Sequence, residues 1–164
     1  MMDQLLEIMG EQANRYEELL GLALEKRDVI IADDIESLQN INHLENILVS
    51  QNQKLEKKRQ AIVSDMALVL NQKEEDLTLT KLIELIEGQE EQPALIEIRD
   101  KFKNILDELK DINQQNGELV QHALEYIEYS TNVMRSNTGQ QPVMYFPGAD
   151  GVYSEEAGYI DTKN

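Results

Sequence analysis

An uninterrupted heptad pattern between residues 95 and 133 constrains the fold of this chain more than any other feature. Positions in this segment alternate in steps of three and four, which is the a/d pattern of a helix that packs along a narrow seam. The pattern predicts one long helix in a coiled coil or narrow bundle. The seam residues are Leu95, Ile98, Phe102, Ile105, Leu109, Ile112, Asn116, Leu119, Ala123, Tyr126, Ser130 and Val133.

Asn116 is a polar residue within this apolar seam. A seam asparagine lowers stability but can fix the register of packed helices, because its side chain needs a hydrogen-bonding partner opposite. We therefore interpret Asn116 as a structural residue, and a direct contact with a binding partner is the alternative. Asn113 lies three residues earlier, on a neighbouring row of the same predicted helix.

Two further long helices are predicted before the heptad segment. Apolar residues at three- and four-residue spacing indicate a helix from about Asp3 to about Lys26 and a second from about Asp34 to about Gln72. A break separates them, and Asp33 is expected to cap the second helix with its carboxylate. Glu36, three residues later, would complete a capping box.

A short helix is predicted between the second and the last long helix. Thr78 is the expected N-cap, and Gly88 is expected to end the helix. The last helix then begins near Pro93, which the first turn tolerates because its missing N–H would be unpaired anyway.

These patterns predict an all-α fold. We expect an elongated antiparallel helical hairpin or bundle of three long helices plus one short helix, coiled-coil-like, with a flexible C-terminal tail. Residues 1–137 would form the helical domain, and residues 138–164 an extended or disordered tail. An a/d seam can be satisfied within one chain or between chains, so the pattern leaves the oligomeric state open.

The predicted tail holds four of the chain's eight aromatic residues, namely Tyr145, Phe146, Tyr153 and Tyr159. Disordered segments are normally poor in aromatic residues, because nothing there buries them. We therefore expect these side chains to be buried, either against a partner or back on the helices. The functional interpretation is a linear recognition motif, and the structural one is a docked tail.

The composition excludes several classes of function. A net charge of −17 repels nucleic acid and anionic lipid, although Lys54, Lys57, Lys58 and Arg59 form one basic cluster, interpreted as a solvated helix face. The absence of cysteine excludes disulfides and thiolate zinc sites. We expect no membrane insertion and a cytoplasmic location, since the first residues do not resemble a signal peptide and no apolar stretch is long enough to span a bilayer.

No motif in the sequence indicates catalysis, a cofactor or a metal site. His43 and His122 are each single histidines on predicted helices, without a second histidine at metal-ligand spacing. A phosphotransfer bundle would need a cation beside the histidine to hold the phosphate, and neither histidine is followed by one. Acidic pairs fall at predicted helix starts or turns, where the helix dipole favours negative charge. We therefore expect a binding protein rather than an enzyme.

Three segments carry a resemblance to a known family. They are DVIIADDIESLQNINHLENIL at the first helix junction, INQQNGELVQHALEYIEYSTNVM with its Asn-x-x-Asn, and MYFPGADG in the tail. Together with the size and acidity of the chain, they resemble the FlgN-like flagellar export chaperones of bacterial type III secretion. The last segment is similar to the family's Tyr-Gly-x-x-Gly element, with Phe146 and Pro147 standing between Tyr145 and Gly148.

The resemblance implies a function and partners. Such chaperones bind hook-associated (hook–filament junction) proteins through their C-terminal amphipathic segments, prevent premature assembly, and deliver these clients to the flagellar export gate and ATPase. The resemblance places the gate contact at Tyr145, with Phe146, Gly148 and Gly151 in the same tail motif. A homodimer in the absence of client is also compatible with the seam. The predicted client-binding residues are Asn113, Asn116, Leu119, Ala123, Tyr126 and Ile127. A coiled-coil adaptor without a role in secretion is the alternative.

Overall fold

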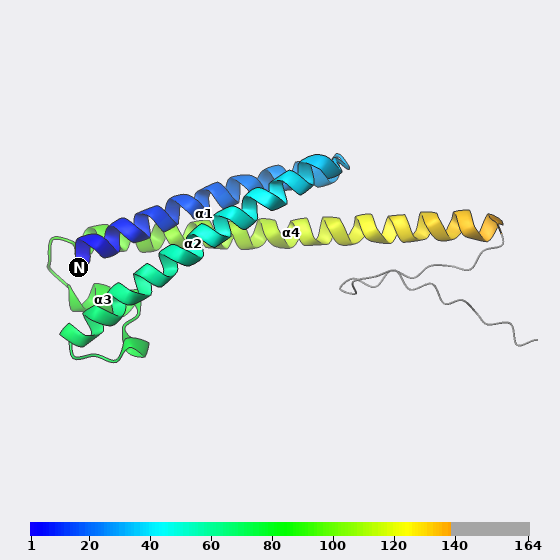
Figure 1. Ribbon diagram of the computed structural model, residues 1–164. Helices are drawn as coiled ribbons and strands as arrows, with labels where there is room; N and C mark the ends of the chain where they lie inside the picture. Colours follow the sequence, from blue (N-terminus) through cyan, green and yellow to red (C-terminus); the bar gives the residue numbers. More distant parts are fainter. Residues whose placement is uncertain (139–164) are drawn as a thin grey trace, which may run out of the picture. The chain divides into compact units, whose positions relative to one another are not determined.

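The computed structural model describes residues 1–138, which form helices joined by loops, with no strand in that range (Figure 1). The all-α prediction is therefore confirmed for these residues, with three long helices and one short one as expected. The elements in chain order are α1 (Met2–Ile31), α2 (Ile35–Val69), the 3-10 helix η1 (Glu74–Asp76), α3 (Leu79–Leu85) and α4 (Gln92–Thr138).

The chain divides into two units, Met1–Gly117 and Glu118–Asn164. The described part of the second unit is residues 118–138, the C-terminal part of α4. The tail was predicted at residues 138–164; Thr138 is the last residue of α4, and residues 139–164 lie outside the described residues. The predicted tail sites Tyr145, Phe146, Gly148 and Gly151 therefore also lie outside them. None of the helices within residues 1–138 has an apolar stretch long enough to cross a bilayer.

In the first unit, α1 and α2 form an antiparallel hairpin, as their paired side chains show. Lys26 Nζ lies 2.8 Å from Glu45 Oε2 near the hairpin turn, and Gln12 Nε2 donates to Glu56 Oε2 farther from it. The N-terminal part of α4 runs in the same direction as α1. Lys101 Nζ lies 3.0 Å from a carboxylate oxygen of Glu17. Farther along both helices, Asn116 is bonded to Ala23.

The prediction that the first helix ends near Lys26 was wrong, because α1 continues to Ile31. The run Val29–Ile31 is β-branched, which lowers helix propensity slightly. Ile30 is buried, however, and this packing outweighs the small propensity cost.

The prediction that Asp33 caps the second helix was wrong by one residue. Asp33 has a φ of 55°, a left-handed conformation that aspartate tolerates better than most residues. Asp34 is the N-cap, and its carboxylate accepts hydrogen bonds from the Ser37 hydroxyl at 2.7 Å and the Ser37 backbone N–H at 3.0 Å. These two bonds favour the ionised form and hold the pKa of Asp34 below its usual value.

The short helix follows the prediction closely. Thr78 Oγ1 accepts from the backbone N–H of Lys81 at 3.2 Å, which confirms Thr78 as the N-cap of α3. Helix α3 ends at Leu85, and Gly88 in the following turn has a φ of 81°, which favours glycine. Pro93 lies in the first turn of α4, also as predicted.

The main core of the first unit lies where its four α-helices meet. Each helix contributes aliphatic side chains, and the apolar residues of the loop before α3 join them. Ile98 and Phe102 of α4 pack against this cluster. Its buried residues are Leu5, Met9, Met66, Ala67, Leu77, Leu82, Ile83, Ile86 and Leu95.

Candidate functional site

Asn116 lies at the C-terminal end of the first unit, with only 4% of its surface exposed. Its Nδ2 donates a hydrogen bond of 2.8 Å to the backbone carbonyl oxygen of Ala23 on α1. The seam asparagine therefore has the partner on a facing helix that its position predicts. Asn113, one turn earlier, is exposed. The hydrogen bond and the burial favour the structural interpretation of Asn116, which is not part of the exposed surface of α4.

Substitutions of Asn116 should separate this hydrogen bond from packing. Asn116→Ala loses the bond and leaves a gap, so we expect it to lower the free energy of unfolding by about 1–2 kcal/mol. Asn116→Leu fills the space and also removes Oδ1, which has no hydrogen-bond partner among the described residues. We therefore expect the leucine variant to be more stable than the alanine variant in urea titrations. A leucine variant less stable than the alanine variant would contradict this interpretation.

After Gly117 the same face of α4 changes from packed to exposed. Leu119 and Ala123 are half-buried, whereas Tyr126 and Ile127 are 71% and 58% exposed. These four predicted site residues lie on successive turns of one helix, so the structure brings them together on one face. The large apolar side chains that are exposed in residues 118–136 are Val120, Tyr126, Ile127, Tyr129, Val133 and Met134.

Sequence reasoning missed three members of this surface: Val120, Tyr129 and Met134. Val120, Ile127 and Met134 are spaced by seven residues, and Tyr129 lies one turn after Tyr126. The seven-residue spacing could have identified Val120, Ile127 and Met134 as one row. The heptad pattern instead placed the seam at the neighbouring positions Leu119, Tyr126 and Val133.

The polar groups of this helix segment give no indication of catalysis. His122 Nδ1 lies 3.6 Å from Glu125 Oε2, and the negative charge of this carboxylate would repel a phosphoryl group. Glu125 accepts a hydrogen bond from Gln121 at 3.0 Å. This bond, and the nearby His122, lower the pKa of the Glu125 carboxyl. Glu125 is therefore held in its ionised form and is unsuited to act as a general acid near neutral pH.

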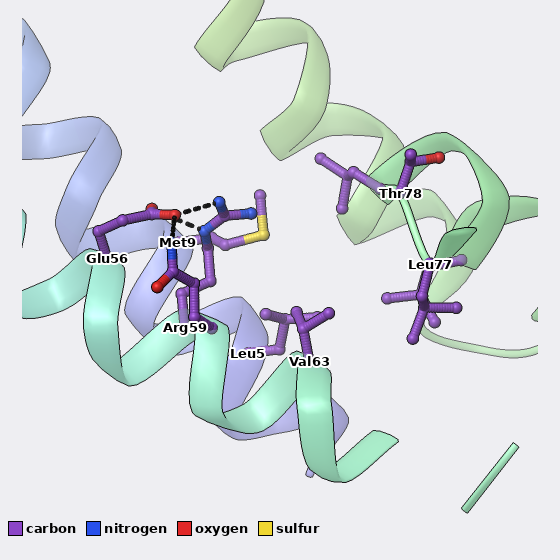
Figure 2. Close-up of a pocket in the computed structure, with 10 residues that line it drawn as sticks. Leu5, Met9, Glu56, Arg59, Val63, Leu77 and Thr78 are labelled. Atoms are coloured by element: carbon purple, nitrogen blue, oxygen red, sulfur yellow. Dashed lines mark hydrogen bonds and ion pairs between the residues drawn. The ribbon is translucent and has the colours of Figure 1, made fainter. Parts of the chain in front are cut away.

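A cavity of about 260 Å³ lies in the first unit between α1, α2 and the segment that leads into α3 (Figure 2). Figure 2 shows Glu56 and Arg59 at one side of it, with Leu5, Val63 and Leu77 around the remainder. Arg59 Nη2 lies 2.6 Å from Glu56 Oε1, and this pairing lowers the pKa of the Glu56 carboxyl.

The cavity offers apolar walls and one satisfied ion pair, without a nucleophile beside a base. Two further cavities have volumes of about 290 and 270 Å³; the first lies between α1 and α4, and the second is also lined by Glu56 and Arg59. Each is smaller than a typical small-molecule site. No cluster of three or more His, Asp or Glu side chains suited to a metal ion occurs among the described residues.

Comparison with known protein families decides the identity of the chain. The model of the family described as FlgN protein matches residues 1–154, nearly the whole chain. The chain belongs to the FlgN family. The matched range includes α1 to α4 and extends past Tyr145 to Gly151 in the tail. Neither a curated protein nor a solved structure gives a significant match.

Membership of the FlgN family confirms the resemblance seen in the sequence. The family consists of chaperones of flagellar export, and its general role in flagellum assembly extends to this protein. A chaperone needs a surface that holds another protein, and the exposed apolar face of α4 in residues 118–134 is the candidate.

Proposed function

We propose that this FlgN protein binds hook-associated (hook–filament junction) proteins in the cytoplasm, prevents their premature assembly, and delivers them to the flagellar export gate and ATPase. The observation that carries the proposal is the exposed apolar face of α4, which begins where the packed seam ends at Gly117. The family supplies the class of client, and the face supplies a place to hold it.

The physical logic is helix-in-groove recognition. A client segment that assembles through an amphipathic helix has an apolar face that must be covered before assembly. Leu119, Ala123, Tyr126 and Ile127 present an apolar surface of matching character. Burying both faces against each other excludes water from each, and it occupies the surface through which the client would otherwise assemble.

Two measurements in the bacterium's own cells and extracts test this proposal. We expect affinity purification of the tagged full chain to enrich hook-associated proteins over other flagellar proteins. We also expect cells that lack the chain to export less of these proteins. Enrichment of other proteins alone, together with unchanged export of hook-associated proteins, would contradict the proposed function.

Without a client, the exposed apolar face of α4 would be open to a second copy of the chain. Sedimentation of the purified protein tests for such a homodimer.

Tyr145, which the resemblance identifies as the gate contact, gives a separate prediction. Tyr145→Ala should leave client affinity nearly unchanged, because the proposed client surface is on α4. We expect it to weaken recruitment of the chaperone–client complex to the export gate, measured by pull-down on the purified gate protein. Tyr153→Ala is a matched control outside the motif. Undiminished association of the Tyr145→Ala variant with the gate would exclude this role.

A further inference from the structure

The exposed face of α4 in residues 119–134 consists of two parallel rows. At about 100° per residue, Val120, Ile127 and Met134 fall within about 40° of one another around the helix axis. Tyr126, Tyr129 and Val133 fall within about 60° of one another on the neighbouring sector. We call these the aliphatic row and the tyrosine row. All six side chains are exposed.

The two rows differ in origin and chemistry. The aliphatic row continues the face that carries Ile98, Phe102, Ile105, Leu109 and Asn116, which packs in the first unit. The tyrosine row lies beside it, on the sector that also carries His122, so apolar rings stand there beside hydroxyl and imidazole groups. One row therefore suits close aliphatic packing, and the other suits contacts that also donate or accept hydrogen bonds.

Together the rows are too wide for one helix. They span about 180° of the helix surface, whereas a helix that packs on one side carries an apolar stripe of about 100°. The packed face in the N-terminal part of α4 is narrower, since its seam residues from Leu95 to Asn116 fall within about 100° of one another. In that part of α4, the sector that continues into the tyrosine row carries exposed polar residues, Glu97, Asn104, Glu108, Asp111 and Gln115. The narrower face already contacts two helices: Lys101 pairs with Glu17 of α1, and Leu95 packs in the core cluster with Met66 and Ala67 of α2.

We propose that the client covers the face with two helices, one packed along the aliphatic row and one along the tyrosine row. This inference rests on the proposed function and adds the form of the client: a helical pair rather than one amphipathic segment.

A second copy of this chain is a poorer occupant of the same face. Each copy carries a net charge of −17, so two copies repel each other at ordinary ionic strength. Glu118, Glu125 and Glu128 lie within the same helix segment and add to this repulsion when two such segments approach. A client without this excess of negative charge meets no such barrier.

Site-specific photo-crosslinking tests the two-helix arrangement. p-Benzoylphenylalanine is incorporated in place of Ile127 in one variant and in place of Tyr129 in another. Each full-length variant is mixed with a purified full-length hook-associated protein and irradiated. Mass spectrometry then identifies the crosslinked client peptides. We expect position 127 to capture one client helix and position 129 to capture a second helix that is separate in the client sequence.

The same client helix at both positions would overturn the inference, and so would peptides from another copy of this chain. Titration of the unmodified chain with the same client separates the two levels of the account. If no complex forms, the proposed function fails; if a complex forms but one helix is captured, only the two-helix inference fails. As a second readout, Ile127→Ser and Tyr129→Ser should each lower the affinity of the chain for the intact client at least about tenfold. The affinity for a synthetic peptide of one client helix should be lowered by only one of these two substitutions. A single-helix peptide that responds equally to both would contradict the arrangement.

Discussion

Replacing Leu119 and Ile127 together by aspartate should abolish client binding, with a loss of affinity of at least about 100-fold. Both residues lie on the proposed contact face, so a bound client would enclose two carboxylates without partners. Removing unpaired charges from water costs several kcal/mol, which exceeds what that loss of affinity requires. Calorimetric titration against a purified hook-associated protein measures the effect.

The controls for this double variant separate binding from folding. Circular dichroism should show unchanged helix content, because both positions are at least partly exposed and aspartate is tolerated on an exposed helix surface. Glu125→Ala, also in the C-terminal part of α4, should bind the client with an affinity within about twofold of the unmodified chain. If the double aspartate variant retains client affinity, the client surface lies elsewhere.

The largest effect on stability is expected from Leu5→Ala. Leu5 has 0% of its surface exposed, belongs to the main core, and lines the cavity in Figure 2. Truncation there adds to existing empty space, and we expect the free energy of unfolding to fall by about 3 kcal/mol. Urea titration followed by circular dichroism measures the loss.

Leu68→Ala is the matched control, because the same substitution is made at a residue 79% exposed at the end of α2. We expect a change below about 0.5 kcal/mol. Equal losses at the two positions would contradict the packing of the first unit described above. At temperatures where Leu5→Ala remains folded, its client affinity should match that of the unmodified chain, since Leu5 is not on the proposed contact face.

Much of the fold could be predicted because local patterns determine it. The heptad spacing of residues 95–133 predicted the long helix α4, and the side chain of Thr78 predicted the start of α3. The hairpin turn was harder. Two adjacent aspartates, Asp33 and Asp34, can each cap a helix. The choice between them depends on the left-handed conformation of Asp33, which the residue type permits without requiring.

The candidate site could be predicted only in part, because a heptad shows which face is apolar and not what covers it. Ile105 and Tyr126 occupy equivalent positions in the pattern, three heptads apart, yet the structure buries the first and exposes the second. The difference depends on where the packed seam of the first unit ends, which is a tertiary property. The same limit explains why Tyr129, outside the a/d positions, was missed.

The most direct test of the account is a titration of the full chain with a hook-associated protein, with and without the client's C-terminal amphipathic segment. We predict a defined complex with the intact client and a loss of affinity of at least about 100-fold when that segment is removed. Equal affinity for both forms, or no binding to the intact client, would contradict the proposal that this FlgN protein holds hook-associated proteins on the exposed face of α4.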